Sequence, residues 1–173
     1  DIAIIQDELP VDVIEFFCLT PLPGSEDHQV LWKKGVTMDP DLNTYDVEHV
    51  CTAHAKMSKR EWEDIYREAW SLYYTPKHMK TLLCRAAATG VPMGSLVKIL
   101  VTFATTVRLE NVHPLQSGIL RSKRPSERRP GLKRENPWIF WSRHAWETLS
   151  KHAIFAGATI RLLLTAIAVS HAP

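Results

Sequence analysis

The chain has 173 residues, of which 45% are hydrophobic and 23% charged, which is the composition of a globular domain and excludes a disordered chain. Its three widely separated cysteines exclude a disulfide framework and favour a reducing compartment, so we expect a cytoplasmic location. The net charge of +2 hides an asymmetry, because residues 1–70 hold fifteen acidic and six basic side chains, whereas residues 71–173 hold four and fifteen. Attraction between the halves, an anionic partner of the basic half, or two solvated surfaces would each explain it.

The first two elements predicted along the chain are a short helix over residues 1–9 and a strand. Residues 13–19 are an almost unbroken apolar run, rich in β-branched and aromatic side chains. The length and continuity of this run predict a strand over about residues 12–20 that is buried on both faces, as in a parallel sheet. The simplest interpretation is an ordinary buried strand followed by a turn.

A rigid loop and a second helix follow the predicted strand. Two prolines and a glycine in residues 20–24 end the strand abruptly, because proline lacks an N–H and glycine permits a sharp turn. Ser25 is a suitable N-cap, and two acidic residues follow it in the first turn of a short helix over residues 26–34. A strand, a rigid loop and a helix start, in that order, are typical of the mouth of an α/β-barrel active site.

Residues 37–55 have a mixed pattern in which residues 39–45 predict turns rather than a strand, and they contain the one close cluster of metal-ligand residue types in the sequence. His49, Cys51 and His54 lie within six residues, but their spacing matches no standard zinc site, and a structural role is favoured. The carboxylates of Asp39, Asp41 and Asp46 invite comparison with a calcium loop. The segment lacks the glycine and the closing glutamate that such a loop needs, so we reject a calcium site.

Three helices are predicted from residue 58 to residue 109. The first, over residues 58–74, begins with a capping box of Ser58 and Glu61, and its aromatic side chains recur on one face, which predicts a packed core rather than a cofactor site. The second runs from Pro76 to Gly90, and the third covers residues 92–109. Short connections indicate that these helices are antiparallel neighbours.

The last part of the chain predicts a basic linker followed by an apolar helix. Between Arg121 and Glu135 there are seven bases and two acids with no apolar period, which indicates a solvated linker. No aromatic residue is interleaved with these bases, so nucleic-acid binding is not expected. A helix then begins at Pro137, and residues 153–169 carry Arg161 as their one charge. Burial against the helix of residues 92–109 is the simplest explanation, and peripheral contact with an anionic membrane is the alternative.

Three segments of the chain resemble one enzyme family when they are considered together. FFCLTPLPGSEDH (16–28), MDPDLNTYD (38–46) and MSKREWEDIYREAW (57–70) resemble the end of the catalytic core of radical S-adenosylmethionine enzymes, in the branch that usually carries a cobalamin-binding domain. The resemblance covers about residues 1–90. It implies a chain that is mainly α, with one barrel-derived strand at the start of a helical C-terminal extension, as a fragment of an α/β (TIM-like) barrel protein.

The resemblance also implies which residues face the cavity of the barrel. The loop after the strand would face the cofactor, mainly through backbone groups, and it comprises Thr20, Pro21, Leu22, Pro23, Gly24 and Ser25. Glu26 and His28 would reach the substrate, whose identity the sequence does not give. The family's cofactors are a 4Fe–4S cluster and S-adenosylmethionine, with cobalamin in the branch named above.

The chain departs from the family in its cysteines. The family holds its cluster with a C-x3-C-x2-C loop, whereas Cys18, Cys51 and Cys84 are far apart and share no flanking pattern. The chain also begins with Asp1 in an already amphipathic turn, which suggests a segment of a longer protein. We therefore expect that the chain alone binds no cofactor and no metal, has no catalytic residue and is inactive, and that its partner is the upstream part of the same protein.

The predicted organisation has four parts. Residues 1–35 form the last helix, strand and loop of a partial (β/α) barrel, residues 36–110 form a helical extension, residues 111–136 form the basic linker, and residues 137–173 form the C-terminal apolar helix. The alternative function is a helical interaction or membrane-peripheral module, in which the basic linker and the apolar helix bind the partner.

Overall fold

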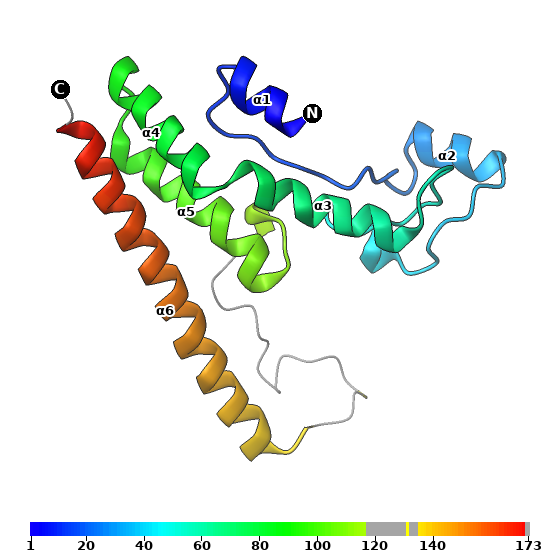
Figure 1. The fold of residues 1–173 in the computed structure, drawn as a ribbon. Coiled ribbons are helices and arrows are strands. Elements are labelled where there is room, and N and C mark those ends of the chain that lie inside the picture. The colour runs from blue at the N-terminus through cyan, green and yellow to red at the C-terminus, as the bar shows by residue number, and fades with distance from the viewer. Residues whose placement is uncertain (117–130, 132–134, 172–173) are drawn as a thin grey trace. The chain divides into compact units, whose positions relative to one another are not determined.

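The computed structural model describes residues 1–116, 131 and 135–171, which form two compact units, Asp1–His78 and Met79–Pro173. The fold is mainly α, as predicted (Figure 1). The helices are α1 (Ile2–Glu8), α2 (Glu26–Lys33), α3 (Lys59–Tyr73), α4 (Pro76–Thr89), α5 (Met93–Glu110) and α6 (Pro137–Ser170), with 3-10 turns η1 (Leu42–Thr44) and η2 (Pro114–Gln116). The division between the units falls within the segment 36–110 that the sequence treats as one extension.

Helix α3 is the centre of the first unit, and its start is the one predicted. The Ser58 hydroxyl accepts a hydrogen bond from the Glu61 N–H, and the Glu61 carboxylate accepts one from the Ser58 N–H, so the capping box is confirmed. The aromatic face of α3 buries Tyr66, Trp70 and Tyr73. The helix therefore presents a rigid aromatic surface on which the rest of the unit packs.

The predicted strand over about residues 12–20 is wrong. The segment is extended, but it has no β partner among the described residues, whose one isolated β-bridge joins Met38 and Thr52. Aromatic side chains hold it instead: the Tyr73 hydroxyl donates to the Val11 carbonyl oxygen at 3.0 Å, and the Tyr74 hydroxyl donates to the Ile14 carbonyl oxygen at 2.6 Å. An apolar run predicts extension and burial, but a strand also requires a neighbouring strand.

The second unit is built on α5, and the part of α4 that belongs to this unit contributes Leu82, Leu83 and Ala86 to its core. The turn between these two helices contains Gly90 at a φ of +74°, which is the glycine that the sequence places at the end of α4. Helix α5 ends at Glu110 and is capped by Asn111, which adopts the left-handed conformation that closes helices. The buried side chains of α5 include Leu96, Leu100 and Val101. Both predicted helices and the short turn between them are confirmed.

Helix α6 is one continuous helix of 34 residues that packs on α5, as expected, but most of its apolar side chains are not buried there. In this contact the Lys151 ammonium pairs with the Glu110 carboxylate at 2.9 Å. Within α6, however, only Phe140, Leu162 and Ala166 are buried. Ten large apolar side chains remain exposed: Trp138, Ile139, Trp141, Trp146, Leu149, Ile154, Ile160, Leu163, Leu164 and Ile167. Packing on a single neighbouring helix covers one side of a helix and leaves the other uncovered.

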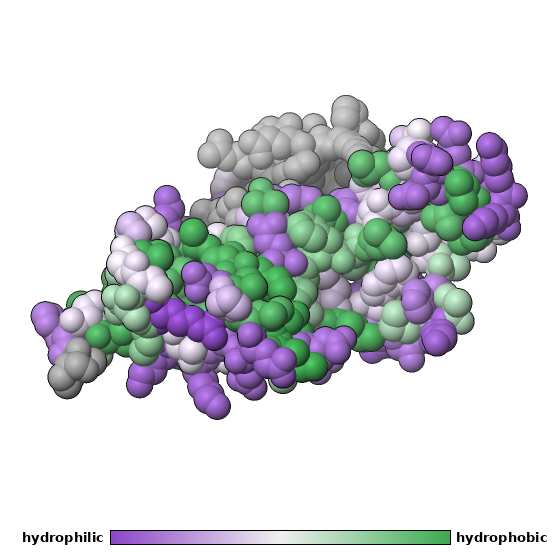
Figure 2. Space-filling model, turned by 90° about the horizontal axis from the view of Figure 1, so that it is seen from above, coloured by the Kyte–Doolittle hydropathy of each residue, from purple (hydrophilic) through white to green (hydrophobic). Residues whose placement is uncertain are grey.

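Five of these ten exposed residues, with two alanines, form one stripe along α6. Seven apolar positions recur three and four residues apart on the side away from α5: Trp146, Leu149, Ala153, Ala156, Ile160, Leu163 and Ile167. We call these seven residues the apolar stripe. Figure 2 shows one face of the molecule, on which hydrophobic side chains reach the surface among polar ones. Of the predicted basic linker over residues 111–136, residues 117–130 and 132–134 lie outside the described residues.

Candidate functional site

The loop predicted to face a cofactor leaves the extended segment beside the loop of residues 46–49. The Thr20 hydroxyl lies against the carbonyl oxygens of Cys18 and Asp46, which holds the base of the loop in place. Pro21 is buried, whereas Leu22, Pro23 and Gly24 are exposed. Gly24 has a φ of +89°, a conformation that side chains other than glycine rarely adopt. The loop is therefore anchored at its base, and its tip is exposed.

The other predicted site residues lie at the start of α2. The Ser25 hydroxyl accepts a hydrogen bond from the His28 N–H at 3.2 Å, so the predicted N-cap is confirmed. Glu26 is exposed in the first turn. The His28 ring is half-buried, lies 6.1 Å from the Tyr45 ring and borders a surface hollow of about 300 Å³. Residues 20–25, Glu26 and His28 are thus contiguous around one turn.

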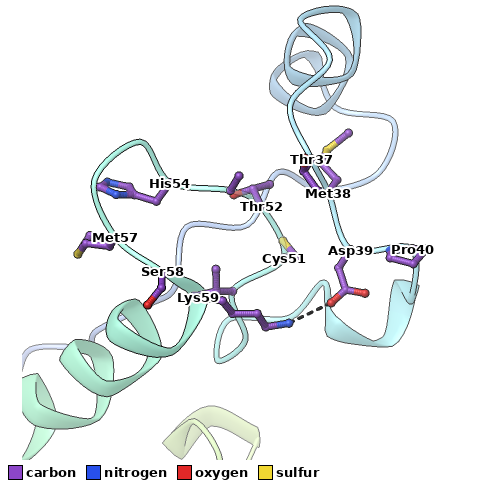
Figure 3. A pocket seen from close by; sticks show the side chains of 12 residues that line it. Thr37, Met38, Asp39, Pro40, Cys51, Thr52, His54, Met57, Ser58 and Lys59 are labelled. Carbon is purple, nitrogen blue, oxygen red and sulfur yellow. Dashed lines mark hydrogen bonds and ion pairs between the residues drawn. The ribbon is translucent and has the colours of Figure 1, made fainter.

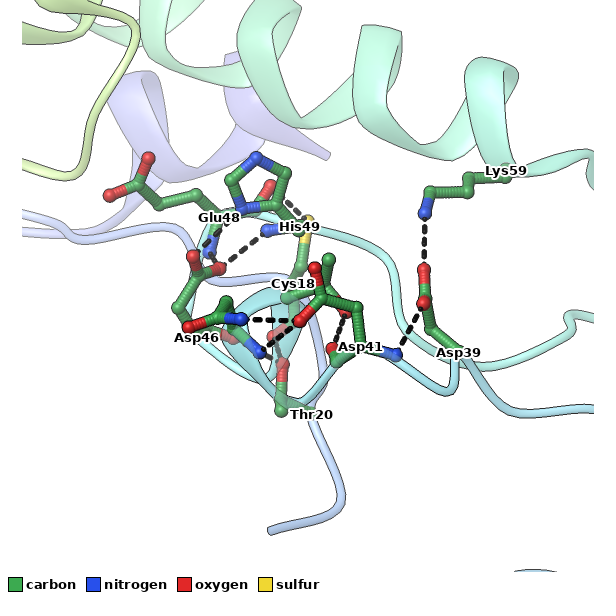
Figure 4. A network of polar contacts seen from close by, with 10 residues as sticks. Cys18, Thr20, Asp39, Asp41, Asp46, Glu48, His49 and Lys59 are labelled. Atoms are coloured by element: carbon green, nitrogen blue, oxygen red, sulfur yellow. Dashed lines mark hydrogen bonds and ion pairs between the residues drawn. The ribbon is translucent and has the colours of Figure 1, made fainter. Parts of the chain in front are cut away.

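A network of polar contacts, which the sequence did not predict, surrounds Asp46 (Figure 4). One carboxylate oxygen of Asp46 accepts hydrogen bonds from the N–H groups of Glu48 and His49, both at 2.8 Å, and the other lies 2.7 Å from the His49 ring. Burial alone would raise the pKa of Asp46, but these hydrogen bonds outweigh it and hold the pKa below its ordinary value of 3.8. The network orders the loop that supports Thr20.

The Cys18 thiol contacts the same loop of residues 46–49 and has low reactivity at neutral pH. Its side chain is 2% exposed, and the thiol donates to the Glu48 carbonyl oxygen at 3.3 Å. Burial, helped by the nearby carboxylates of Glu63 and Asp46, raises the pKa of Cys18 to about 11. The thiol is therefore protonated at neutral pH and is a poor nucleophile or metal ligand.

A second feature is a pocket of about 450 Å³ lined by residues 37–40, 50–54 and 57–59, which we call the loop pocket (Figure 3). The Lys59 ammonium donates to the Asp39 carboxylate at 3.0 Å on one side of it. Hydrogen bonds from the Asp41 backbone N–H and from the Lys59 ammonium lower the pKa of Asp39. None of the predicted cofactor or substrate residues lines this pocket. Its residues come from three short segments between positions 37 and 59 that follow no helical or strand period, so periodicity could not reveal it.

The described residues offer no group of three or more His, Cys, Asp or Glu side chains that could hold a metal ion. Cys51 is buried like Cys18, whereas Cys84 is exposed on α4. The cysteines of this chain consequently do not fit an iron–sulfur cluster, which needs closely spaced thiolates.

We expect Asp46→Asn to lower the free energy of unfolding by about 1 kcal/mol at neutral pH, because the amide cannot accept all of these hydrogen bonds. The folded-state pKa of Asp46 is lowered, so its contribution is complete above about pH 3.8 and is lost as the pH falls further. The difference between the two proteins in urea unfolding should therefore shrink below that pH. Asp7→Asn, at an exposed position of α1, should show no such difference. A gap that is constant with pH would contradict the role of the Asp46 charge.

Comparison of the chain with protein-family models, with curated proteins and with solved structures finds no match.

Proposed function

We propose that this chain is the C-terminal portion of a radical S-adenosylmethionine enzyme and that residues 12–20 complete the catalytic barrel of the whole protein. The observation that supports this most strongly is the uneven cover of the extended segment. At residues 17–19 the side chains alternate as in a strand: Cys18 is buried, whereas Phe17 is 50% exposed and Leu19 is 75% exposed. Residues 12–16 are all half-buried. One face packs on α3 through Phe16, and the other presents large apolar side chains that a further layer of the whole protein would bury, as both faces of a barrel strand are buried.

The inner face of the segment packs on the aromatic residues of α3. The Phe16 ring packs edge-on against Trp70, with 5.3 Å between ring centroids, and against Tyr73, with 6.2 Å. The segment is therefore held in an extended conformation before any neighbouring strand is added. Such pre-organisation suits the closing strand of a barrel, because less conformational entropy is lost when the sheet forms.

On this proposal the loop of residues 20–25 faces the cofactor through its exposed tip, and Glu26 and His28 lie where the substrate enters. When bound, the cluster and S-adenosylmethionine supply radical chemistry. This chain lacks the cysteines that would hold the cluster, so its own residues can only position the cofactor and exclude water. The upstream part of the same protein supplies the cluster.

The proposed role of the loop is tested in the longer protein, purified and reconstituted without oxygen. We expect Pro23→Ala with Gly24→Ala to weaken S-adenosylmethionine binding by roughly tenfold, because loss of one well-placed backbone hydrogen bond costs about 1.4 kcal/mol. The matched control is Gly35→Ala with Pro40→Ala, which also changes one exposed proline and one glycine at positive φ. Equal binding by both variants in equilibrium dialysis would remove the loop from the cofactor site.

A second candidate function, contact with a membrane surface, is supported by α6. Among the described residues, α6 is the one helix that is long and apolar enough to cross a membrane, and only 11% of its most apolar 18-residue window is buried. Trp138, Trp141 and Trp146 are 50–85% exposed near its start. The seven bases that precede it in sequence would attract anionic lipid, and tryptophan favours the level of the lipid headgroups.

The packing of α6 favours a position along the membrane surface over one across the bilayer. Helix α5 covers one side of α6 and carries the exposed charges Lys98 and Arg108, which a bilayer-spanning α6 would bring toward the hydrocarbon. Arg161 is also exposed within the apolar part of α6. A helix with one apolar face and one covered face suits the interface between headgroups and acyl chains.

Co-sedimentation of the chain with vesicles of phosphatidylcholine and phosphatidylglycerol tests this second candidate. We expect binding at low salt that weakens at high salt and on neutralising the seven bases of residues 121–134. Absence of binding at low salt would exclude membrane contact. Self-association of α6 through its apolar stripe would then be detected by sedimentation velocity as a dimer.

A further inference from the structure

A groove runs between α4 and α6 within the second unit. It has a volume of about 1010 Å³. Its lining comes from Lys80, Cys84 and 87–88 on α4, and from Arg161, 164–165 and 168–170 on α6. Each set recurs at intervals of three, four, seven or eight residues, so each helix presents one face to the groove.

The groove combines positive charge with an apolar floor. Lys80 and Arg161 are both exposed, and no acidic side chain lines the groove. Among the described residues neither cation forms an ion pair. Lys80 and Arg161 are each the first residue of their helix to line the groove. Figure 1 shows α4 and α6 both running toward the end of the unit at which the C-terminus lies, so the two cations lie at the same end of the groove. Small and apolar side chains, including Leu164, follow along both helices.

We propose that this groove binds an anionic phospholipid, with the phosphate between Lys80 and Arg161 and an acyl chain along Leu164 and Ala168. A phosphate group is complementary to a lysine ammonium and an arginine guanidinium that lack acidic partners. A free phosphate would use the two cations but not the apolar floor, whereas a lipid uses both. The proposal rests on the membrane contact proposed above and names the lipid class that the contact selects.

Cys84 provides a probe of occupancy, because it is exposed and lines the groove, whereas Cys18 and Cys51 are buried. Burial also raises the pKa of Cys51, as it does that of Cys18, so neither competes for a maleimide at neutral pH. The full chain is labelled with and without dihexanoyl phosphatidic acid below its critical micelle concentration. We expect this lipid to slow labelling of Cys84 at least tenfold, and dihexanoyl phosphatidylcholine and inorganic phosphate to leave it nearly unchanged.

Matched charge removals identify the site. Lys80→Gln with Arg161→Gln should weaken the protection by phosphatidic acid by roughly 30-fold, since each basic residue near an anionic lipid contributes about a factor of five. Lys98→Gln with Arg108→Gln removes one lysine and one arginine from exposed positions of α5 and should retain the protection. Labelling rates are compared with and without lipid within each variant, because the charges themselves alter thiol reactivity.

Each result either supports or overturns the proposal. Equal loss in the two double variants would mean diffuse attraction, and equal protection by inorganic phosphate would mean a site for free phosphate; either overturns it. If the chain binds vesicles while phosphatidic acid leaves Cys84 labelling unchanged, the groove proposal fails and membrane contact stands. If phosphatidic acid protects Cys84 but vesicles are not bound, membrane contact fails and the groove remains a site for a phosphate-bearing amphiphile.

Discussion

Replacement of Trp70 by alanine is expected to destabilise the first unit by about 3–5 kcal/mol, the usual cost of removing a buried large aromatic side chain. Trp70 is 3% exposed and packs edge-on against Phe16. It also stacks face-on against Tyr74, with 5.8 Å between the Trp70 and Tyr74 ring centroids. Its loss releases the extended segment from α3. The rate at which Cys18 is labelled by a maleimide, followed by mass spectrometry of its peptide, should therefore rise more than 100-fold.

The control for Trp70 is Ile65→Ala on the same helix. Ile65 is 50% exposed, so its truncation should cost less than about 1 kcal/mol and change Cys18 labelling only slightly. Trp70→Phe keeps an aromatic ring and should give an intermediate rate. Equal labelling in the Trp70 and Ile65 alanine variants would contradict the central position of Trp70 in the unit.

The double substitution Leu149→Glu with Ile160→Glu is expected to reduce vesicle binding at least 100-fold. Both side chains belong to the apolar stripe and are 69% and 58% exposed, so the substitutions should not disturb the packing of α6 on α5. Full burial of two such side chains contributes about 3–6 kcal/mol, and two added acids also repel anionic lipid. Co-sedimentation with vesicles of phosphatidylcholine and phosphatidylglycerol measures the change.

Thr89→Glu with Ser95→Glu adds the same two charges at exposed positions of the second unit, away from the apolar stripe. This control should lower vesicle binding only by the few-fold that its charge explains. If both double variants bind equally, the apolar stripe does not enter the lipid. If the wild-type chain is a dimer that the Leu149 and Ile160 substitutions dissociate, the apolar stripe is a protein interface instead.

The helices could be predicted from local sequence, because their signals are local. The cap at Ser58 with Glu61, the cap at Ser25 and the glycine at position 90 each identified a helix end that the structure has. The strand could not be predicted reliably, because pairing depends on which segments lie beside residues 12–20. Within the described residues that place is taken by α3 and by the loop of residues 46–49.

The environment of the candidate site was also beyond the sequence. Residues 20–25, Glu26 and His28 are contiguous along the chain, so their grouping follows from sequence alone. The hydrogen bond from the Thr20 hydroxyl to the Asp46 carbonyl oxygen joins residues 26 positions apart, and the ion pair of Lys59 with Asp39 joins residues 20 positions apart. For α6, composition gave the apolar character, but the side that α5 covers depends on tertiary packing.

The most direct test of the radical-enzyme proposal is made on the longer protein, purified and reconstituted without oxygen. We expect about four iron and four sulfide per chain, as a 4Fe–4S cluster requires, and formation of 5′-deoxyadenosine from S-adenosylmethionine under reducing conditions. A colourless protein that contains no iron after reconstitution and forms no 5′-deoxyadenosine would contradict the proposal. The helical, membrane-peripheral module would then be the better account of this chain.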